Sequence, residues 1–153
     1  MQPTTTRLPA VVDQLLTVAR AALPAATVLD GPRAAQELHD EVLQVGVGNG
    51  DTDEAYGVEQ EPAGGLSGRG VEVITVHCEF STWSGDQDGA VPTLRTRVGA
   101  VLGLLDNAFR ADQQLAATCD RVNLGTRLRW YALQSEDGPG LGVEFDITAR
   151  AWL

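Results

Sequence analysis

The chain has 153 residues, 43% of them hydrophobic and 21% charged, which is typical of a single soluble globular domain covering residues 1–153. Its 21 acidic and 11 basic residues give a formal net charge of −10, which argues against simple nucleic-acid binding because that needs a basic surface. Two cysteines, Cys78 and Cys119, are too few for a disulfide framework and are expected to be small, semi-buried side chains.

The apolar segments favour neither secretion nor membrane insertion. Asp13 and Arg20 interrupt the apolar stretch near the N-terminus, so we expect no signal peptide. The longest strongly apolar run, residues 98–105, is too short to span a bilayer. We therefore expect a protein that is made inside the cell and has no membrane partner.

The first predicted element is a helix from Leu8 to the residue before Pro24. Apolar side chains recur there at helical spacing, while Asp13 and Arg20 lie off the apolar stripe. The stripe comprises Leu8, Val11, Val12, Leu15, Leu16, Ala19 and Leu23. Two strands are predicted next, at residues 27–29 and 41–47.

Residues 48–70 are rich in glycine and acidic side chains and predict a long solvated loop or arm. We expect this arm to reach a neighbouring subunit or another protein, anchored by its bulkiest apolar groups, Tyr56, Val58 and Leu66. The predicted partner-interface residues are Asp51, Asp53, Glu54, Tyr56, Val58, Glu59, Glu61 and Leu66. The alternative is that the loop folds back on its own domain.

The rest of the chain alternates between strand and helix patterns. In order, the patterns predict a strand at residues 71–83, a helix from Pro92 to about residues 116–119, a strand at 121–134, a turn at 135–140 and a strand at 141–153. The last strand alternates apolar and mostly polar side chains, as a strand with one buried face does.

The predicted core lies between the sheet and the second helix. It comprises Ile74, Val76, Phe80, Val143, Phe145 and Ile147, covered by Leu94, Val98, Val101, Leu102, Leu105 and Phe109. The order α-β-β-β-α-β-β predicts an α+β fold, with a single, mostly antiparallel β-sheet and helices packed on one face.

No motif in the sequence has the spacing that chemistry requires. The glycines of residues 46–50 lack the following helix of a phosphate-binding loop, and residues 49–54 lack the register of a calcium-binding loop. The two histidines, His39 and His77, form no zinc motif, and Ser67 would become a nucleophile only if one of them were brought to it. We therefore predict no catalytic, metal or cofactor-binding residues, no cofactor and no enzymatic activity.

Three tryptophans are spread over three predicted strands, at Trp83, Trp130 and Trp152. A ligand-binding groove is one interpretation of their spread, but packing on the sheet or contact between subunits is the simpler one. A long strand at the end of a chain must be covered or must pair with another chain. This requirement favours an assembly protein over an isolated catalyst.

Several segments, taken in order, resemble the tail terminator (tail-completion) proteins of long-tailed phages, particularly those of actinobacterial phages. These segments are Val28-Leu29-Asp30-Gly31-Pro32, Leu43-Gln44-Val45-Gly46-Val47-Gly48 before the acidic loop, the strand at residues 71–80, the helix at residues 95–109 and the closing residues 143–150. The resemblance lies in their order and spacing along the chain.

The resemblance implies a small α+β subunit of a ring, expected to be a hexamer, in the tail or neck of a virion assembled in the host cytoplasm. Such rings cap the tail tube, stop its polymerisation and join it to the head–tail connector or stopper protein. DNA would pass through the channel without specific binding, in keeping with the acidic charge. The alternatives are another head–tail connector or head-completion protein, or a small-ligand-binding α+β domain.

Overall fold

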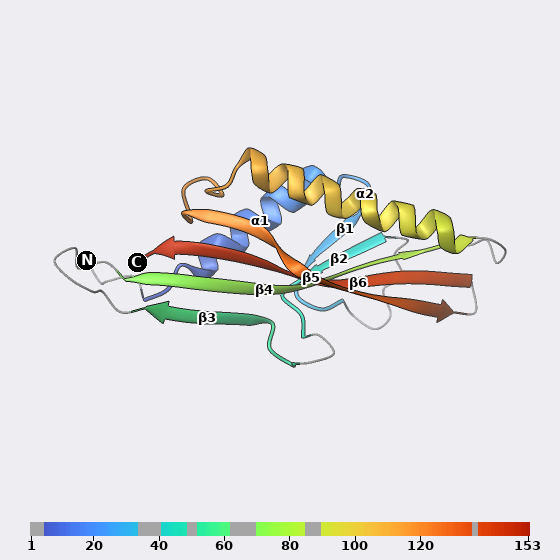
Figure 1. Cartoon of the computed structure of the whole chain (residues 1–153), viewed down its shortest axis with the longest axis horizontal. Coiled ribbons are helices and arrows are strands. Elements are labelled where there is room, and N and C mark those ends of the chain that lie inside the picture. The colour runs from blue at the N-terminus through green and yellow to red at the C-terminus, as the bar shows by residue number, and fades with distance from the viewer. Residues whose placement is uncertain (1–4, 34–40, 49–51, 62–69, 85–89, 136–137) are drawn as a thin grey trace.

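The fold is built on three long strands, β4, β5 and β6, which run along the long axis of the molecule (Figure 1). This computed structural model describes residues 5–33, 41–48, 52–61, 70–84, 90–135 and 138–153. Its elements, in chain order, are α1 (Leu8–Ala22), β1 (Thr27–Asp30), β2 (Glu41–Val45), β3 (Tyr56–Glu61), β4 (Val71–Trp83), α2 (Ala90–Ala111), β5 (Arg121–Ser135) and β6 (Gly138–Trp152).

The strands form one six-stranded sheet with the order β1-β2-β4-β6-β5, in which β3 also pairs with β4. Only β1 and β2 are parallel; every other pair is antiparallel. β2 and β3 lie end to end along the same side of β4, because β2 pairs with residues 78–82 of β4 and β3 with residues 71–76. On the other side of β4 lies β6, and β5 lies beyond β6 as the outermost strand. β3 and β5 are therefore on opposite edges of the sheet.

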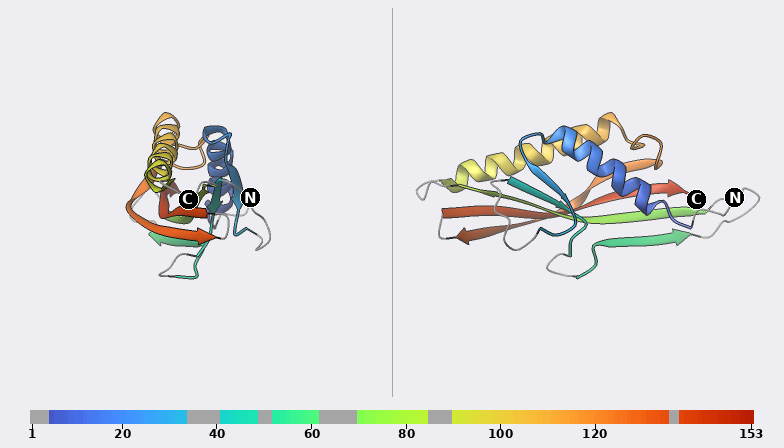
Figure 2. Two further views of the ribbon diagram at one scale, coloured as in Figure 1. Left: turned by 90° about the vertical axis from the view of Figure 1, so that its right-hand side faces the viewer. Right: turned by 180° about the vertical axis from the view of Figure 1, so that it is seen from behind.

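Both helices cover the same face of the sheet, as the end-on view of Figure 2 shows. Alternate side chains of β4 and β6 point into this layer, as strand geometry requires. All twelve predicted core residues are buried, including Phe80, Phe109 and Phe145. The structure therefore confirms the α+β class, the mostly antiparallel sheet and the one-sided packing of the helices.

The prediction that residues 48–70 form a loop or arm is wrong for residues 56–61, which form β3. Tyr56 is paired with Val76, and Glu61 is paired with Val71. Glutamate and glycine disfavour strands, but without β3 the backbone N–H and C=O groups of this half of β4 would lack strand partners on that side. The observed element order therefore has four strands, not three, before the second helix.

Element ends also differ from the prediction around α2 and β6. α2 begins two residues before Pro92, which lies in the first turn, where proline is tolerated. It ends at Ala111, short of the predicted end, and a turn follows in which Leu115, Ala116 and Ala117 have positive φ. β6 begins at Gly138 and so extends into the predicted turn, although residues 136–137 lie outside the described part of the chain.

Two buried or half-buried carboxylates fix the helices to the sheet. Glu72 of β4 accepts hydrogen bonds from Thr6 Oγ1 at 2.5 Å, from the Arg7 backbone N–H at 2.7 Å and from Gln60 Nε2 at 3.1 Å. A carboxylate at the start of α1 satisfies an N-terminal backbone donor and interacts favourably with the helix dipole. At the other end of the sheet, Glu41 of β2 accepts two hydrogen bonds from Arg97 of α2, at 2.6 and 2.8 Å.

Candidate functional site

The two long edges of the sheet are the candidate functional site. We call the outer side of β5 the β5 edge and the outer side of β3, with the exposed residues Asp53 and Glu54 that precede it, the β3 edge. Among the described residues, β5 pairs only with β6, and β3 pairs only with β4. Each edge therefore presents strand backbone that no other described strand pairs with, which is the usual template for association with another chain.

The β5 edge combines exposed apolar side chains with positive charge. Leu128 and Trp130 are 43% and 40% exposed, although they pair with the buried residues Phe145 and Val143 on the helix-bearing face. β5 also carries three of the eleven arginines of the chain and no acidic residue. These arginines, Arg121, Arg127 and Arg129, are all exposed. In a chain with a net charge of −10, this strand is a local basic stripe.

Sequence reasoning did not single out the β5 edge, because Leu128 and Trp130 alternate with polar residues in the way that core residues do. The available signal was charge. A strand-length segment with three arginines and no acid is unusual in so acidic a chain, and it marks a surface that is electrostatically different from the rest. That Leu128 and Trp130 are exposed follows only from the three-dimensional structure.

The β3 edge holds most of the predicted partner-interface residues. Asp53, Glu54, Glu59 and Glu61 are exposed, and Val58 is 41% exposed. Asp51 and Leu66 lie outside the described residues, as do the chemistry candidates Ser67 and His39. The fold thus gathers the described acidic residues of the set along one edge, while their contact with a partner stays a prediction.

Tyr56 differs from the other predicted anchors because its ring packs on its own domain. It is half-buried against the core, and a β-carbon on Gly46 would lie within 3 Å of the ring, so this position needs a glycine. Gly46 also has a positive φ of +79°. Burial, followed by the nearby charge of Asp30, raises the pKa of the Tyr56 hydroxyl. Tyr56 is therefore placed to anchor β3 to its own sheet.

On the helix-free face of the sheet, the side chain of Tyr131 connects β5 to β6 and β4. Tyr131 of β5 lies over Gly142 of β6 and reaches Glu79 of β4 with a side-chain hydrogen bond. Burial and this bond raise the pKa of the Tyr131 hydroxyl far above its ordinary value. Beside it, Arg129 lies 3.9 Å from Glu144, and this long ion pair joins an exposed arginine to a half-buried glutamate. The contacts of Tyr131 hold the C-terminal half of β5 against β6 and connect it to β4, the next strand of the sheet.

The same face carries a histidine–carboxylate pair. His77 Nδ1 lies 2.6 Å from Asp146 Oδ1, on paired positions of β4 and β6. Such a pair orients an imidazole, but nucleophilic catalysis also needs a reactive hydroxyl or thiol within hydrogen-bond reach. The adjacent Cys78 does not supply one, because its side chain points to the opposite face and burial raises the pKa of its thiol to about 12.

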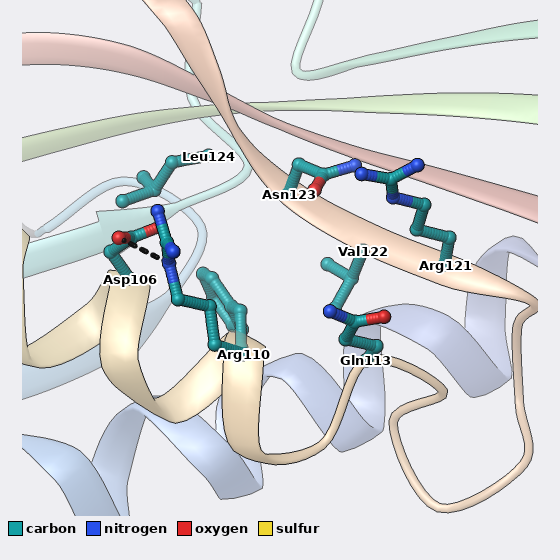
Figure 3. Close-up of a pocket in the computed structure, with 8 residues that line it drawn as sticks. Asp106, Arg110, Gln113, Arg121, Val122, Asn123 and Leu124 are labelled. Atoms are coloured by element: carbon teal, nitrogen blue, oxygen red, sulfur yellow. Dashed lines mark hydrogen bonds and ion pairs between the residues drawn. The ribbon is translucent and has the colours of Figure 1, made fainter.

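Two small cavities lie at the end of the molecule where α2 is followed by β5. One, of about 280 Å³, lies between α2 and the first residues of β5, and Figure 3 shows Asp106, Arg110 and Asn123 around it. Asp106 and Arg110 pair with each other at 2.9 Å. The other, of about 230 Å³, adjoins Trp152. Ligand pockets are usually larger and mostly apolar, so neither cavity has the form of a small-molecule site.

In the part of the chain that the structure describes, no three histidine, cysteine or acidic side chains gather as a metal site would require. No described helix is both long enough and apolar enough to cross a membrane. Comparison of the sequence with protein-family models finds no matching family, and comparison with curated proteins finds no match.

Proposed function

We propose that this chain is a structural ring subunit of a phage tail, of the tail terminator type. In this role it forms a ring, expected to be a hexamer, that caps the tail tube, stops tube polymerisation and joins the tube to the head–tail connector. It acts in the tail or neck of the virion after assembly in the host cytoplasm. The proposal assigns no enzymatic activity, cofactor or membrane partner to the chain.

The observation that best supports the proposal is the β5 edge, whose outer side pairs with no other strand among the described residues. An isolated soluble domain usually shortens or covers its edge strands, whereas β5 has 15 residues and exposes Leu128 and Trp130 beside its arginines. Large exposed apolar side chains on an edge strand favour burial against another protein. The resemblance noted in the sequence then gives the kind of assembly.

The charge of the chain supports the proposed relation to DNA. A ring of six copies, each with a net charge of −10, would surround DNA with an acidic protein, which repels the phosphate backbone. Repulsion lets a polyanion pass through a channel without being held there. A head-completion or other connector protein could have the same acidic charge. The test must therefore measure the effect of the chain on growth of the tail tube.

The test is an assembly assay with the tail tube protein encoded in the same genome. The purified chain, added while tubes are growing, should stop elongation and leave particles capped at one end in electron micrographs. A connector of another kind would form complexes with head proteins and leave tube growth unchanged. Tubes that elongate normally at a saturating concentration of the chain would contradict the terminator role.

A further inference from the structure

The two edges of the sheet carry opposite charge. The β5 edge contains three exposed arginines and no acid, whereas the β3 edge contains Glu59 and Glu61 after the exposed Asp53 and Glu54, and no base. The edges belong to the same sheet and lie on opposite sides of it. A charge difference of this kind gives the sheet a basic side and an acidic side.

One pair of opposite charges also lies in the same row of paired residues. Arg121 pairs with Arg150 of β6, Arg150 pairs with Val73 of β4, and Val73 pairs with Glu59 of β3. These four residues form one row of paired positions across the sheet. Arg121 lies at one end of the row, on β5, and Glu59 lies at the other end, on β3. Because paired residues point to the same face, both of these side chains lie on the helix-free face.

Both edges also carry exposed apolar side chains on the other face. Val58 pairs with the buried Ile74, and Leu128 pairs with the buried Phe145, so both lie on the face that carries the helices. Val58 and Leu128 are both exposed, as is Trp130. In the register that places Arg121 of one copy opposite Glu59 of the next, Val58 would lie opposite Val122, because Val58, Ile74, Ala149 and Val122 form one row. The rows of Leu128 and Trp130 end at β2, so these two side chains would lie beyond the end of the next copy's β3.

Strand direction is also compatible with a sheet that continues from one copy into the next. β3 is antiparallel to β4, β4 to β6, and β6 to β5, so β3 and β5 run in opposite directions. A second copy added beside the first by rotation or translation would place its β3 antiparallel to the first copy's β5. Antiparallel pairing is the arrangement in which directly opposed side chains come closest.

We propose that copies of this chain join head to tail, with the β5 edge of one copy pairing with the β3 edge of the next. This inference rests on the proposed ring, for which it supplies the interface. A head-to-tail contact uses two different surfaces of each copy, and it generates a closed ring when the rotation between copies closes. β1 is a weaker candidate for the acidic side, because it has four residues and only Asp30 as a charged group.

Charge reversal on one edge at a time provides the test. The β5-edge variant is Arg121→Glu with Arg127→Glu, and the β3-edge variant is Glu59→Arg with Glu61→Arg. The native mass of each should fall from that of the assembly to that of one chain of 16.2 kDa. The control matched to the β5-edge variant is Arg95→Glu with Arg110→Glu on α2, which also replaces two arginines by glutamates and should leave the assembly intact.

Mixtures of the variants identify the partner of each edge. The β5-edge variant has two acidic edges and the β3-edge variant has two basic edges, so an equimolar mixture should form an alternating assembly of the full mass although neither variant assembles alone. A chain with all four reversals keeps the net charge of −10 and complementary edges, so it should recover the full assembly. Circular dichroism melts verify folding, and glutamine replacements at the same four positions serve if a reversal variant does not fold.

Several results would overturn the inference. Wild-type rings with edge variants that still form rings would reject this interface and leave the proposed ring intact. Self-association of the β3-edge variant through two β5 strands would show a symmetric contact instead of a head-to-tail one. A mixture that remains monomeric would also contradict it. A wild-type chain that is monomeric at every concentration would reject both the interface and the ring.

Discussion

The ring of Tyr131 lies directly over Gly142, so that a β-carbon on this glycine would come within 2.5 Å of the Cζ atom of the ring. Only a residue without a side chain fits this contact. The contact lets Tyr131 cross β6 and bond to Glu79 of β4. The position of Tyr131 against β6 therefore depends on a glycine in the neighbouring strand.

Replacing Gly142 with alanine should therefore destabilise the fold. The added methyl group would displace the Tyr131 ring, and overpacking of this kind costs about 1–3 kcal/mol. Urea denaturation measures the loss. The control is Gly103→Ala on α2, where nothing beyond its chain neighbours and the backbone of its own helix lies within 4 Å of the added group and the helix gains about 0.5–1 kcal/mol. Equal effects of the two substitutions would contradict the proposed role of the Tyr131–Gly142 contact.

Truncation of the core residue Phe109 to alanine should cost about 3–5 kcal/mol, because the side chain is 1% exposed and packs between α2 and the sheet. Denaturant unfolding gives the free-energy difference. Leu104, which is 43% exposed on the same helix, is the control, and its replacement by alanine should change stability by less than about 0.5 kcal/mol. An unchanged unfolding midpoint for Phe109→Ala would show that this helix does not cover the core.

Alkaline pH should destabilise the protein partly through Cys78. Burial raises the pKa of its thiol from 9.0 to about 12, so above pH 9 the unfolded chain loses a proton that the folded chain keeps. The corresponding stability is fully present below pH 9 and is lost as the pH rises toward 12. Unfolding free energies at pH 8 to 11 should fall less steeply for Cys78→Val than for the wild type. Parallel slopes would contradict this assignment.

The proposed ring should not bind duplex DNA tightly. The net charge of −10 on each chain repels phosphates, so fluorescence anisotropy with a short duplex should show no gain in affinity between 200 and 50 mM salt. A basic DNA-binding protein gains affinity steeply over this range. Micromolar or tighter binding that strengthens as salt falls would contradict passage of DNA without retention.

Periodicity alone predicts most of the fold because α1, β4, α2 and β6 each present one apolar side to a common core. Phe80, Phe109 and Phe145 could be assigned to that core from their spacing in the sequence. β3 escaped prediction because its glutamates and glycine disfavour a strand, and only the open edge of β4 makes that strand favourable.

The candidate site was predictable only in part for a related reason. The acidic residues Glu59 and Glu61 stand out by composition, whereas Leu128 and Trp130 follow the same alternation as core residues. Whether such side chains are buried depends on where the helices end above the sheet, and that is a tertiary property. The row that joins Arg121 to Glu59 depends on strand register across four strands, which no local pattern encodes.

The mass of the native wild-type assembly tests the central claim most directly. Native mass spectrometry, supported by light scattering at several concentrations, should find a closed complex of six chains of 16.2 kDa that persists on dilution. Persistence separates a closed ring from open aggregates, whose mass grows with concentration. A single species of 16.2 kDa at every concentration would contradict the account of this chain as a ring subunit.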